Sequence, residues 1–305
     1  MTRHIARRIA QPQIERNPRP VAGSLEFSTG KDSAFASSIY ITASRLDRIA
    51  AELTEQDWLL LSFVADSRLA TSRQLIRRFW TDDPKANPAS ARAGARALKR
   101  LSEWRVLDPL PGRARGGVRG GSATLIYAVG VAGAKLLARR GLHLRRLGAP
   151  GERHINHTLA CTGAVVDLYA ADTRGDLDLI EVQQEPACHR AFLGAWGARL
   201  WVRPDLFARV GVGALEDRWF IEIDLATEHT GTLLAKANRY LAHYRSGSEQ
   251  QEAGIYPRVA WSVPDARRAE QLEKVLRRLP GEAQKMFVVC LRDELVALLA
   301  DEARS

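Results

Sequence analysis

The chain has 305 residues, of which 46% are hydrophobic and 26% charged, and its formal net charge is +10. This composition is typical of a globular protein long enough for two domains, and it excludes a fibrous or wholly disordered chain. No apolar run approaches the roughly 18 residues of a membrane span, the first residues lack the apolar core of a secretory signal, and the three cysteines are widely spaced without a CxxC pair. We therefore expect a cytoplasmic protein with no membrane partner and no disulfide framework.

Positive charge is concentrated in the first half. Residues 1–155 contain 27 Lys or Arg and 13 Asp or Glu, a balance of +14, whereas residues 156–305 contain 18 and 22, a balance of −4. A GC-rich genome can raise the arginine content, but it does not explain this asymmetry. The first half is therefore the candidate for binding a polyanion.

The first elements predicted along the chain are helices. Residues 1–38 are rich in Arg, Pro, Ser and Gly, and we interpret them as a flexible basic arm that is either solvated or in contact with DNA. A helix is expected from near Ile39 to Leu53. Thr54 with Asp57, and Thr71 with Gln74, have the spacing of capping boxes that begin two further helices. The expected buried positions of these two helices are Leu59, Leu60, Phe63 and Val64, and then Leu75, Ile76 and Phe79.

A basic helix is predicted next, after chain breaks at Pro84 and Pro88. One of its faces is apolar, with Ala91, Ala95, Leu98 and Leu101. A different face carries the cations Arg92, Arg96, Lys99 and Arg100.

A glycine-rich, cationic loop follows this helix between two predicted strands. The loop, residues 112–122, carries Arg113, Arg115 and Arg119, and residues 106–110 and 124–129 have strand composition. With the helix predicted at 131–140, the order is that of a winged-helix domain, in which the helix enters the major groove and the loop follows phosphates. We therefore predict a winged-helix domain at residues 39–145 that binds double-stranded DNA through these cations.

The second half alternates strands with helices. Strands are expected near 177–182, 201–210, 218–225, 258–263 and 285–290, and helices near 157–171, 228–245, 265–278 and 291–300. This alternation predicts an α/β or α+β domain with a mixed sheet over residues 154–305, after a Gly-, Pro- and Arg-containing boundary.

Acidic residues stand out in two strands of this domain. The period of two over residues 220–225 places Glu222 and Asp224 on one face, and Asp205 lies near a second strand that can pair with theirs across a hairpin at 211–216. Three converging carboxylates repel unless a cation lies between them, so these acids are candidate ligands of Mg²⁺ or Mn²⁺ and candidate catalytic residues. The alternative is a sheet face in water, where Glu222 and Asp224 pair with Arg218, Lys236 or Arg239.

Three further residues are ambiguous. Lys236 either points over the sheet toward the acids, as an assisting catalytic residue, or is a solvated lysine. His154 and His157 either ligate a metal or form a polar helix start, and His157 could point at the acids if its helix packs on the sheet. No P-loop is present, so no nucleotide cofactor is expected, and no three-histidine site accompanies a tyrosine nucleophile as a relaxase requires.

Several short motifs together resemble the replication-relaxation family, over about residues 53–264. They are Leu53–Asp57, Tyr127–Gly130, His157–Leu159, Arg203–Asp205, Phe220–Asp224 with Thr227–Glu228, and Lys236 with Tyr240. This family is associated with plasmid replication and DNA relaxation on mobile elements of Gram-positive bacteria. The resemblance implies a DNA-binding protein that acts in plasmid or mobile-element replication, relaxation or transfer, with plasmid replication or transfer proteins as partners.

The second domain also resembles the PD-(D/E)xK fold of restriction-endonuclease-like nucleases. Asp205 matches the first acid of that pattern and Glu222 the second, while Asp224 stands where the fold carries its lysine. Lys236 would have to replace that lysine. The alternatives to a DNA-binding module are thus a divalent-metal nuclease or nickase and, as a weaker reading, a winged-helix transcriptional regulator. The helix at 39–53 could support a homodimer.

Overall fold

A computed structural model describes residues 41–110, 124–144, 151–194, 197–212 and 215–302. The predicted basic arm at 1–38 and the loop cations Arg113, Arg115 and Arg119 lie outside these residues. Among the helices that the structure describes, none is long and apolar enough to cross a membrane.

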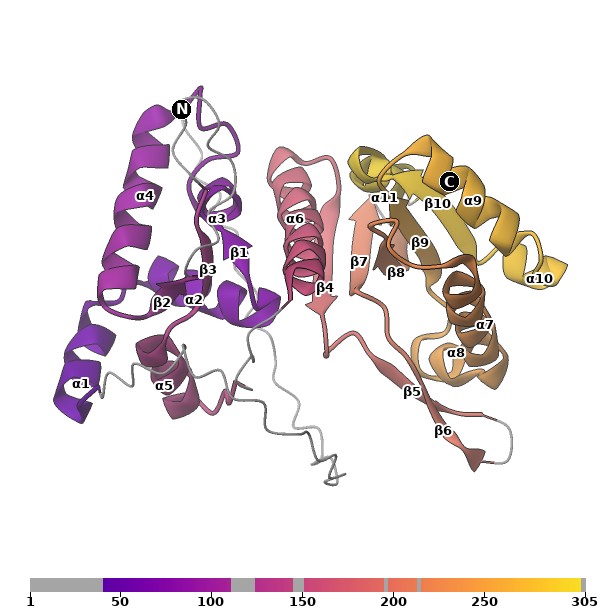
Figure 1. Cartoon of the computed structure of the whole chain (residues 1–305), viewed down its shortest axis with the longest axis horizontal. Helices are drawn as coiled ribbons and strands as arrows, with labels where there is room; N and C mark the ends of the chain where they lie inside the picture. Colours follow the sequence, from indigo (N-terminus) through magenta and orange to yellow (C-terminus); the bar gives the residue numbers. More distant parts are fainter. Residues whose placement is uncertain (1–40, 111–123, 145–150, 195–196, 213–214, 303–305) are drawn as a thin grey trace. The chain divides into compact units, whose positions relative to one another are not determined.

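The first region, residues 41–144, combines helices with a small antiparallel sheet (Figure 1). The sheet has the order β1-β3-β2, with β3 pairing antiparallel to both neighbours. The predicted helices and both predicted strands are present, and β1, which the sequence did not predict, lies between the second and third helices. The bounds are α1 Ala43–Glu52, α2 Glu55–Ser67, β1 Ala70–Thr71, α3 Ser72–Phe79, α4 Pro88–Glu103, β2 Leu107–Pro109, β3 Ile126–Val129 and α5 Val131–Arg139.

The capping boxes are confirmed, but one buried position of α2 was predicted wrongly and another was missed. Thr54 caps α2 with Asp57, and Thr71 caps α3 with Gln74, each through reciprocal side-chain and backbone hydrogen bonds. Leu59 is 45% exposed, whereas the unpredicted Leu61 is fully buried.

The apolar face of α4 is shifted from the predicted one. Leu98 and Leu101 are buried, but Ala95 is exposed and Gly94 takes the inward position instead. A Cβ atom at Gly94 would lie 2.8 Å from Cδ2 of Trp80, so only glycine lets the indole pack this closely on the helix.

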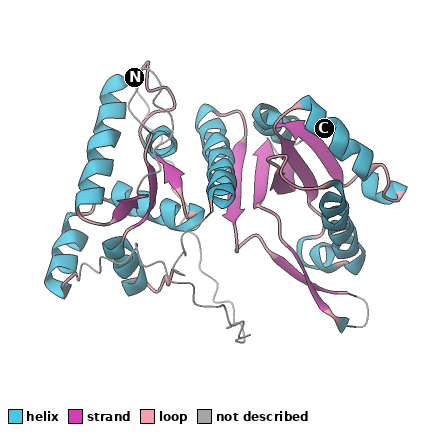
Figure 2. Cartoon of the chain, in the orientation of Figure 1, coloured by secondary structure: helices cyan, strands magenta, loops and turns pink. Residues whose placement is uncertain are grey.

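The second region contains a five-stranded mixed sheet, as the sequence predicts (Figure 2). Its order is β10-β9-β8-β7-β4, with antiparallel pairing from β4 to β7 and β7 to β8 and parallel pairing from β8 to β9 and β9 to β10. The bounds are α6 Glu152–Arg174, β4 Asp178–Gln184, β5 Arg190–Leu193, β6 Arg199–Val202, β7 Leu206–Val212, β8 Leu215–Ile223, α7 Thr230–Ser246, α8 Ser248–Ala253, β9 Arg258–Val263, α9 Ala266–Leu276, α10 Gly281–Gln284, β10 Phe287–Leu291 and α11 Leu295–Glu302.

The single strand predicted at 201–210 is in fact two strands. Residues 203–205 separate β6, whose partner among the described strands is β5 in a two-stranded ribbon, from β7 in the main sheet. Pro204 lacks a backbone N–H and cannot donate to a ladder, which accounts for the break. Asp205 is thereby placed at the start of β7, where the chain enters the sheet.

Helices cover both faces of the sheet. Trp219, Ile221 and Ile223 of β8 pack in one apolar cluster with residues of α6 and α11, while Phe220 packs in another with residues of α7 and α9. Glu222 is fully buried, so the interpretation of its face as water-exposed is wrong.

Helix α6 contacts the small sheet region as well as the large sheet. The amide of Gln74 on α3 donates to the carbonyl of Leu159 at 2.7 Å, and the hydroxyl of Thr162 donates to the carbonyl of Leu69 at 2.8 Å. Residues 41–305 accordingly fall in one compact unit. The placement of a domain boundary near residue 150 stays a prediction.

Candidate functional site

Asp205, at the start of β7, is held by contacts from two other elements. Its side chain is almost fully buried, and Oδ2 accepts from the backbone N–H of Ile223 at 2.7 Å and lies 3.3 Å from Nε2 of His157. Burial alone would raise the pKa of this carboxyl, but the contact with His157, the charge of Lys236 and the Ile223 N–H outweigh it, so the pKa lies below its usual value. Asp205 is therefore an ionised carboxylate at neutral pH.

Glu222 lies on the neighbouring strand β8 and has no solvent exposure. Its Oε1 accepts from the hydroxyl of Tyr240 at 2.5 Å, and its Oε2 lies 2.5 Å from Nζ of Lys236. Burial raises the pKa of Glu222 to about 8, and the ammonium of Lys236 offsets that rise only in part. This carboxyl is therefore able to exchange a proton near neutral pH.

Lys236 reaches this cluster from α7, one turn before Tyr240. The interpretation of Lys236 as a solvated lysine is wrong, because its ammonium pairs with Glu222. The Lys236 side chain is nevertheless 29% exposed to solvent. Burial would lower the pKa of Lys236, but the negative charges of Glu222 and Asp205 outweigh burial and raise it. A protonated amine thus stands beside two carboxyls and remains reachable from solvent.

Asp224 does not join this cluster. Strand β8 ends at Ile223, and the Asp224 carboxylate binds elsewhere: Oδ2 lies 2.5 Å from Nε of Arg268 on α9, and Oδ1 accepts from the N–H of Ala226 at 2.8 Å. Arg268 also donates to the carbonyl of Glu228 at 2.9 Å. The structure therefore brings together Asp205, Glu222 and Lys236 of the predicted site and ties Asp224 to an arginine that sequence reasoning missed.

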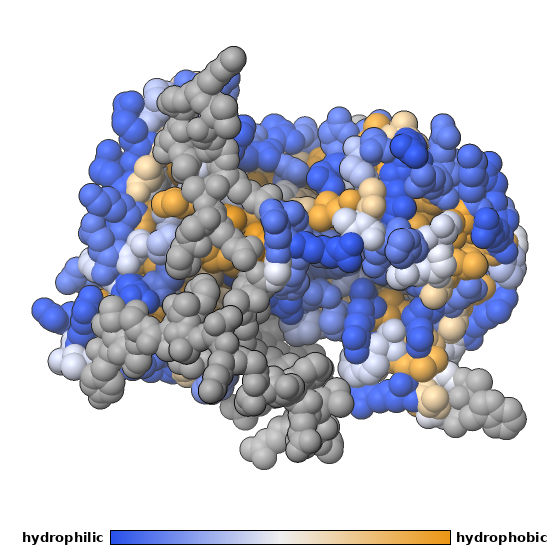
Figure 3. All heavy atoms as spheres, viewed as in Figure 1, coloured by the Kyte–Doolittle hydropathy of each residue, from blue (hydrophilic) through white to orange (hydrophobic). Residues whose placement is uncertain are grey.

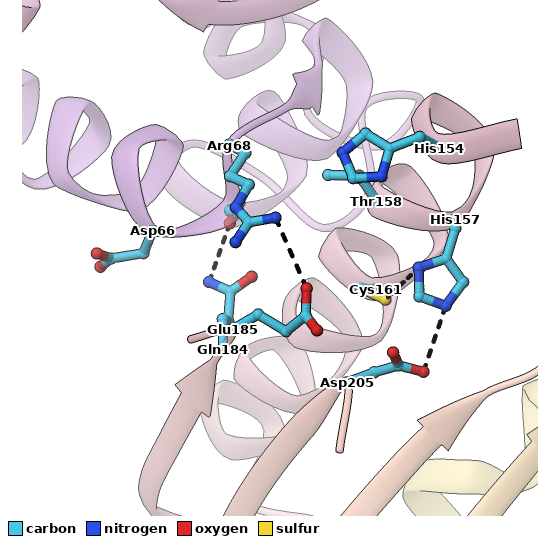
Figure 4. Close-up of a pocket in the computed structure, with 10 residues that line it drawn as sticks. Asp66, Arg68, His154, His157, Thr158, Cys161, Gln184, Glu185 and Asp205 are labelled. Atoms are coloured by element: carbon cyan, nitrogen blue, oxygen red, sulfur yellow. Dashed lines mark hydrogen bonds and ion pairs between the residues drawn. The ribbon is translucent and has the colours of Figure 1, made fainter. Parts of the chain in front are cut away.

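His157 points at the acids, as one interpretation of the sequence allowed. It lies on α6, one turn before Cys161, and its Nδ1 is 3.7 Å from the Cys161 Sγ (Figure 4). The contact with Asp205 outweighs burial and raises the pKa of His157. Cys161 was not predicted, although its spacing of four from His157 on a helix was a usable signal.

A pocket of about 180 Å³ opens beside these residues (Figure 4). One wall comes from the end of α2, where the Arg68 guanidinium lies 3.6 Å from Glu185 and the Ser67 hydroxyl accepts from Gln184 at 3.0 Å. These four residues could not be selected from the sequence, because the pair at 67–68 lies more than 100 positions from the pair at 184–185. The pocket is lined by Asp66, Ser67, Arg68, His154, His157, Thr158, Cys161, Gln184, Glu185 and Asp205.

The cations predicted on α4 divide into two kinds. Arg92, Arg96 and Lys99 are exposed, and the surface over α4 is hydrophilic in Figure 3. Arg100 instead donates to both carboxylate oxygens of Asp57, at 2.6 and 2.7 Å. Because Asp57 is only 3% exposed, Arg100 neutralises a buried charge within the fold.

Comparison with known proteins identifies one family. The family model for replication-relaxation matches residues 61–259. The match includes α3, α4 and α6. It also includes Asp205, Glu222 and Lys236, which we call the acid–lysine cluster. Searches of curated proteins and of solved structures found no match.

Proposed function

Because the chain belongs to the replication-relaxation family, we propose that it binds double-stranded DNA and acts in the replication, relaxation or transfer of a plasmid or mobile element. The observation that carries the proposal is the exposed cationic face of α4 in a region whose elements have the winged-helix order. In such domains a helix of this kind enters the major groove.

The contacts within the first region support this role for α4. The inner side of α4 packs against the rest of the region through Gly94, Leu98 and Leu101. The helix begins at Pro88, and the Asn87 side chain caps its N-terminus. A helix held this firmly can present Arg92, Arg96 and Lys99 to phosphates or base edges with little loss of conformational freedom on binding.

Fluorescence anisotropy with a labelled duplex tests the proposal. If about six phosphates are contacted, the logarithm of affinity falls against the logarithm of salt with a slope of roughly −5. Replacing Arg92, Arg96 and Lys99 by Ala removes three of these contacts, so we expect about 100-fold weaker binding near 0.15 M salt and a slope flatter by about 3.

A matched control removes the same charge from another helix. Arg267, Lys274 and Arg278 are exposed in and beside α9, and their triple Ala variant should bind DNA like the wild type. Equal losses in both variants would mean that binding follows net charge alone and would overturn the assignment to α4.

A second candidate function, a divalent-metal nuclease or nickase, is favoured by one specific observation. Asp205 directly precedes β7 and Glu222 lies on the adjacent strand β8, with Lys236 beside both, and these residue types match the PD-(D/E)xK pattern with the lysine supplied from α7. In this proposal Lys236 stabilises the negative charge that develops on the phosphate, and Glu222 holds the ammonium of Lys236 in place.

The residues fit a metal ion only in part. Asp224 is occupied by Arg268 and Ala226, and both oxygens of Glu222 have partners, whereas Oδ1 of Asp205 has none among the described residues. Asp205 is therefore the carboxylate most available to Mg²⁺ or Mn²⁺. A bound ion would neutralise charge on the scissile phosphate.

Supercoiled plasmid incubated with Mg²⁺ or Mn²⁺ tests this candidate. We expect the wild type to convert it to the nicked form and the isosteric D205N/E222Q double variant to leave it supercoiled. Glu181→Gln, at the edge of the sheet, is the control and should nick like the wild type. Retarded plasmid without nicking from wild type and double variant alike would eliminate the nuclease and leave the DNA-binding module.

A further inference from the structure

A nitrogen, a sulfur and an oxygen donor converge at the edge of the acid–lysine cluster. One ring nitrogen of His157, Sγ of Cys161 and one carboxylate oxygen of Asp205 all lie within 4.8 Å of one another (Figure 4). We propose that these three residues bind a thiophilic divalent transition-metal ion, of the Zn²⁺ or Co²⁺ type.

The backbone fixes all three donors before any ion arrives. His157 and Cys161 are one turn apart on α6, so they share a face of that helix. Asp205 is held from the opposite side by the N–H of Ile223 at 2.7 Å. A site that needs only side-chain adjustments loses little entropy on binding.

One of the separations already matches a tetrahedral ion. Metal–ligand bonds of about 2.0–2.3 Å give ligand-to-ligand edges of about 3.3–3.8 Å in a tetrahedron. Nε2 of His157 lies 3.3 Å from Oδ2 of Asp205, which is the length of one such edge. Sγ of Cys161 lies within 4.8 Å of the nitrogen and oxygen donors, so its side chain has to move closer to complete the site. The ion would bind one ring nitrogen, and the thiol would lose its proton to become a ligand.

Donor type and charge decide the class of metal. Mg²⁺ prefers an all-oxygen shell, whereas a mixed set of imidazole, thiolate and carboxylate favours Zn²⁺ and its neighbours in the first transition row. One thiolate and one carboxylate balance the two charges of the ion. Glu222 is then not needed as a ligand and keeps its pairing with Lys236 and Tyr240.

The pocket leaves the fourth position accessible. Three protein ligands with an open position are typical of catalytic rather than structural zinc sites, and the 180 Å³ pocket lies on the side that His157, Cys161 and Asp205 line. The catalytic meaning of this site rests on the nuclease proposal, in which a Zn²⁺-class ion on Asp205 then takes the place of Mg²⁺ or Mn²⁺. Binding of the ion itself is measurable without DNA.

Titration of the full-length protein with Co²⁺, followed by absorption, tests the site. We expect one ion per chain, tetrahedral d–d bands and a thiolate-to-cobalt charge-transfer band. Cys161→Ser should abolish the charge-transfer band, and His157→Ala should weaken Co²⁺ binding by at least about tenfold, the lower limit for losing even an outer-shell partner. Cys290→Ala removes a buried thiol that lies outside the site and should leave the spectrum unchanged.

The outcomes separate this site from the nuclease proposal. A wild-type spectrum without a charge-transfer band, or a band that survives in Cys161→Ser, overturns the site. A band that requires Cys161, in a protein that does not nick plasmid with Mg²⁺, Mn²⁺, Zn²⁺ or Co²⁺, supports the site and eliminates the nuclease. Circular dichroism of each variant confirms its fold, and Cys161→Ala serves as a second variant if Cys161→Ser does not fold.

Discussion

The two regions of the molecule treat charge in opposite ways. On α4 the cations Arg92, Arg96 and Lys99 are exposed to solvent, so their charges stay hydrated and can contact phosphates. In the second region three buried carboxylates lie beside the start of β7 and the end of β8, and each has a cationic partner: Asp205 pairs with His157, Glu222 with Lys236, and Asp224 with Arg268. His157 and Lys236 are partly exposed, whereas Arg268 is buried.

Buried and exposed charges are expected to affect different properties of the protein, the first its stability and the second its binding to DNA. A buried ion pair is weak evidence for stability, because apolar residues of similar volume often serve as well, yet breaking one partner is costly. The exposed cations should affect DNA affinity and leave stability unchanged.

The largest effect should come from breaking the Asp224–Arg268 pair. Both side chains are less than a tenth exposed, so Arg268→Ala leaves an uncompensated buried carboxylate and should destabilise the protein by about 3–5 kcal/mol in urea unfolding. Arg267→Ala, next in sequence but exposed, should change the unfolding free energy by less than about 0.5 kcal/mol. If both variants unfold alike, the pair does not contribute as its burial implies.

A pH-dependent effect of a few kcal/mol is expected from Glu222. Its pKa is about 8 in the folded chain against 4.5 as the ordinary value, so between these values the folded state binds the proton more tightly. The free energy of unfolding therefore falls as pH rises through this window, by an amount of the order of a few kcal/mol.

Thermal unfolding of Glu222→Gln across the same window measures this effect. The variant lacks the titrating group, so any stability advantage of the wild type should be largest near pH 4.5 and shrink toward pH 8. Glu270→Gln, an exposed control on α9, should follow the wild-type profile. A difference between wild type and Glu222→Gln that is constant or grows with pH would contradict the raised pKa.

The smallest effect separates two arginines of the same helix. Arg100→Ala leaves Asp57 buried without its cation and should cost about 2 kcal/mol of stability, since hydrogen bonds to charged groups contribute about 1.5–3 kcal/mol. Arg96→Ala should leave stability unchanged and weaken DNA binding severalfold, because it loses one phosphate contact. Urea unfolding and anisotropy on both variants check this, and a reversed pattern would move the DNA-binding face away from Arg96.

Much of the local structure could be predicted because its causes are local. The capping boxes at Thr54 and Thr71 act over three residues, and the pairing of the strands bearing Asp205 and Glu222 follows from a short hairpin. The ribbon of β5 and β6 was missed, because its pairing depends on where Pro204 interrupts the chain.

The candidate site was predicted in its residue types but not in its pairings. Alternation along β8 marked Glu222 and Asp224 as equivalent, yet Lys236 pairs with the first and Arg268 with the second. Arg268 lies 44 residues from Asp224 along the chain, and no local pattern connects them.

The sequence by itself determined the family, the cationic first half, the capped helices and the acids of the second half, since each depends on neighbouring residues or on composition. Only the tertiary structure decided that Glu222 is buried and that Arg100 pairs with Asp57. It also decided that the side chains of His157 and Cys161 lie close to that of Asp205. The physical reason is that burial, ion pairing and donor convergence are set by packing between elements, and packing brings together residues that the chain keeps far apart.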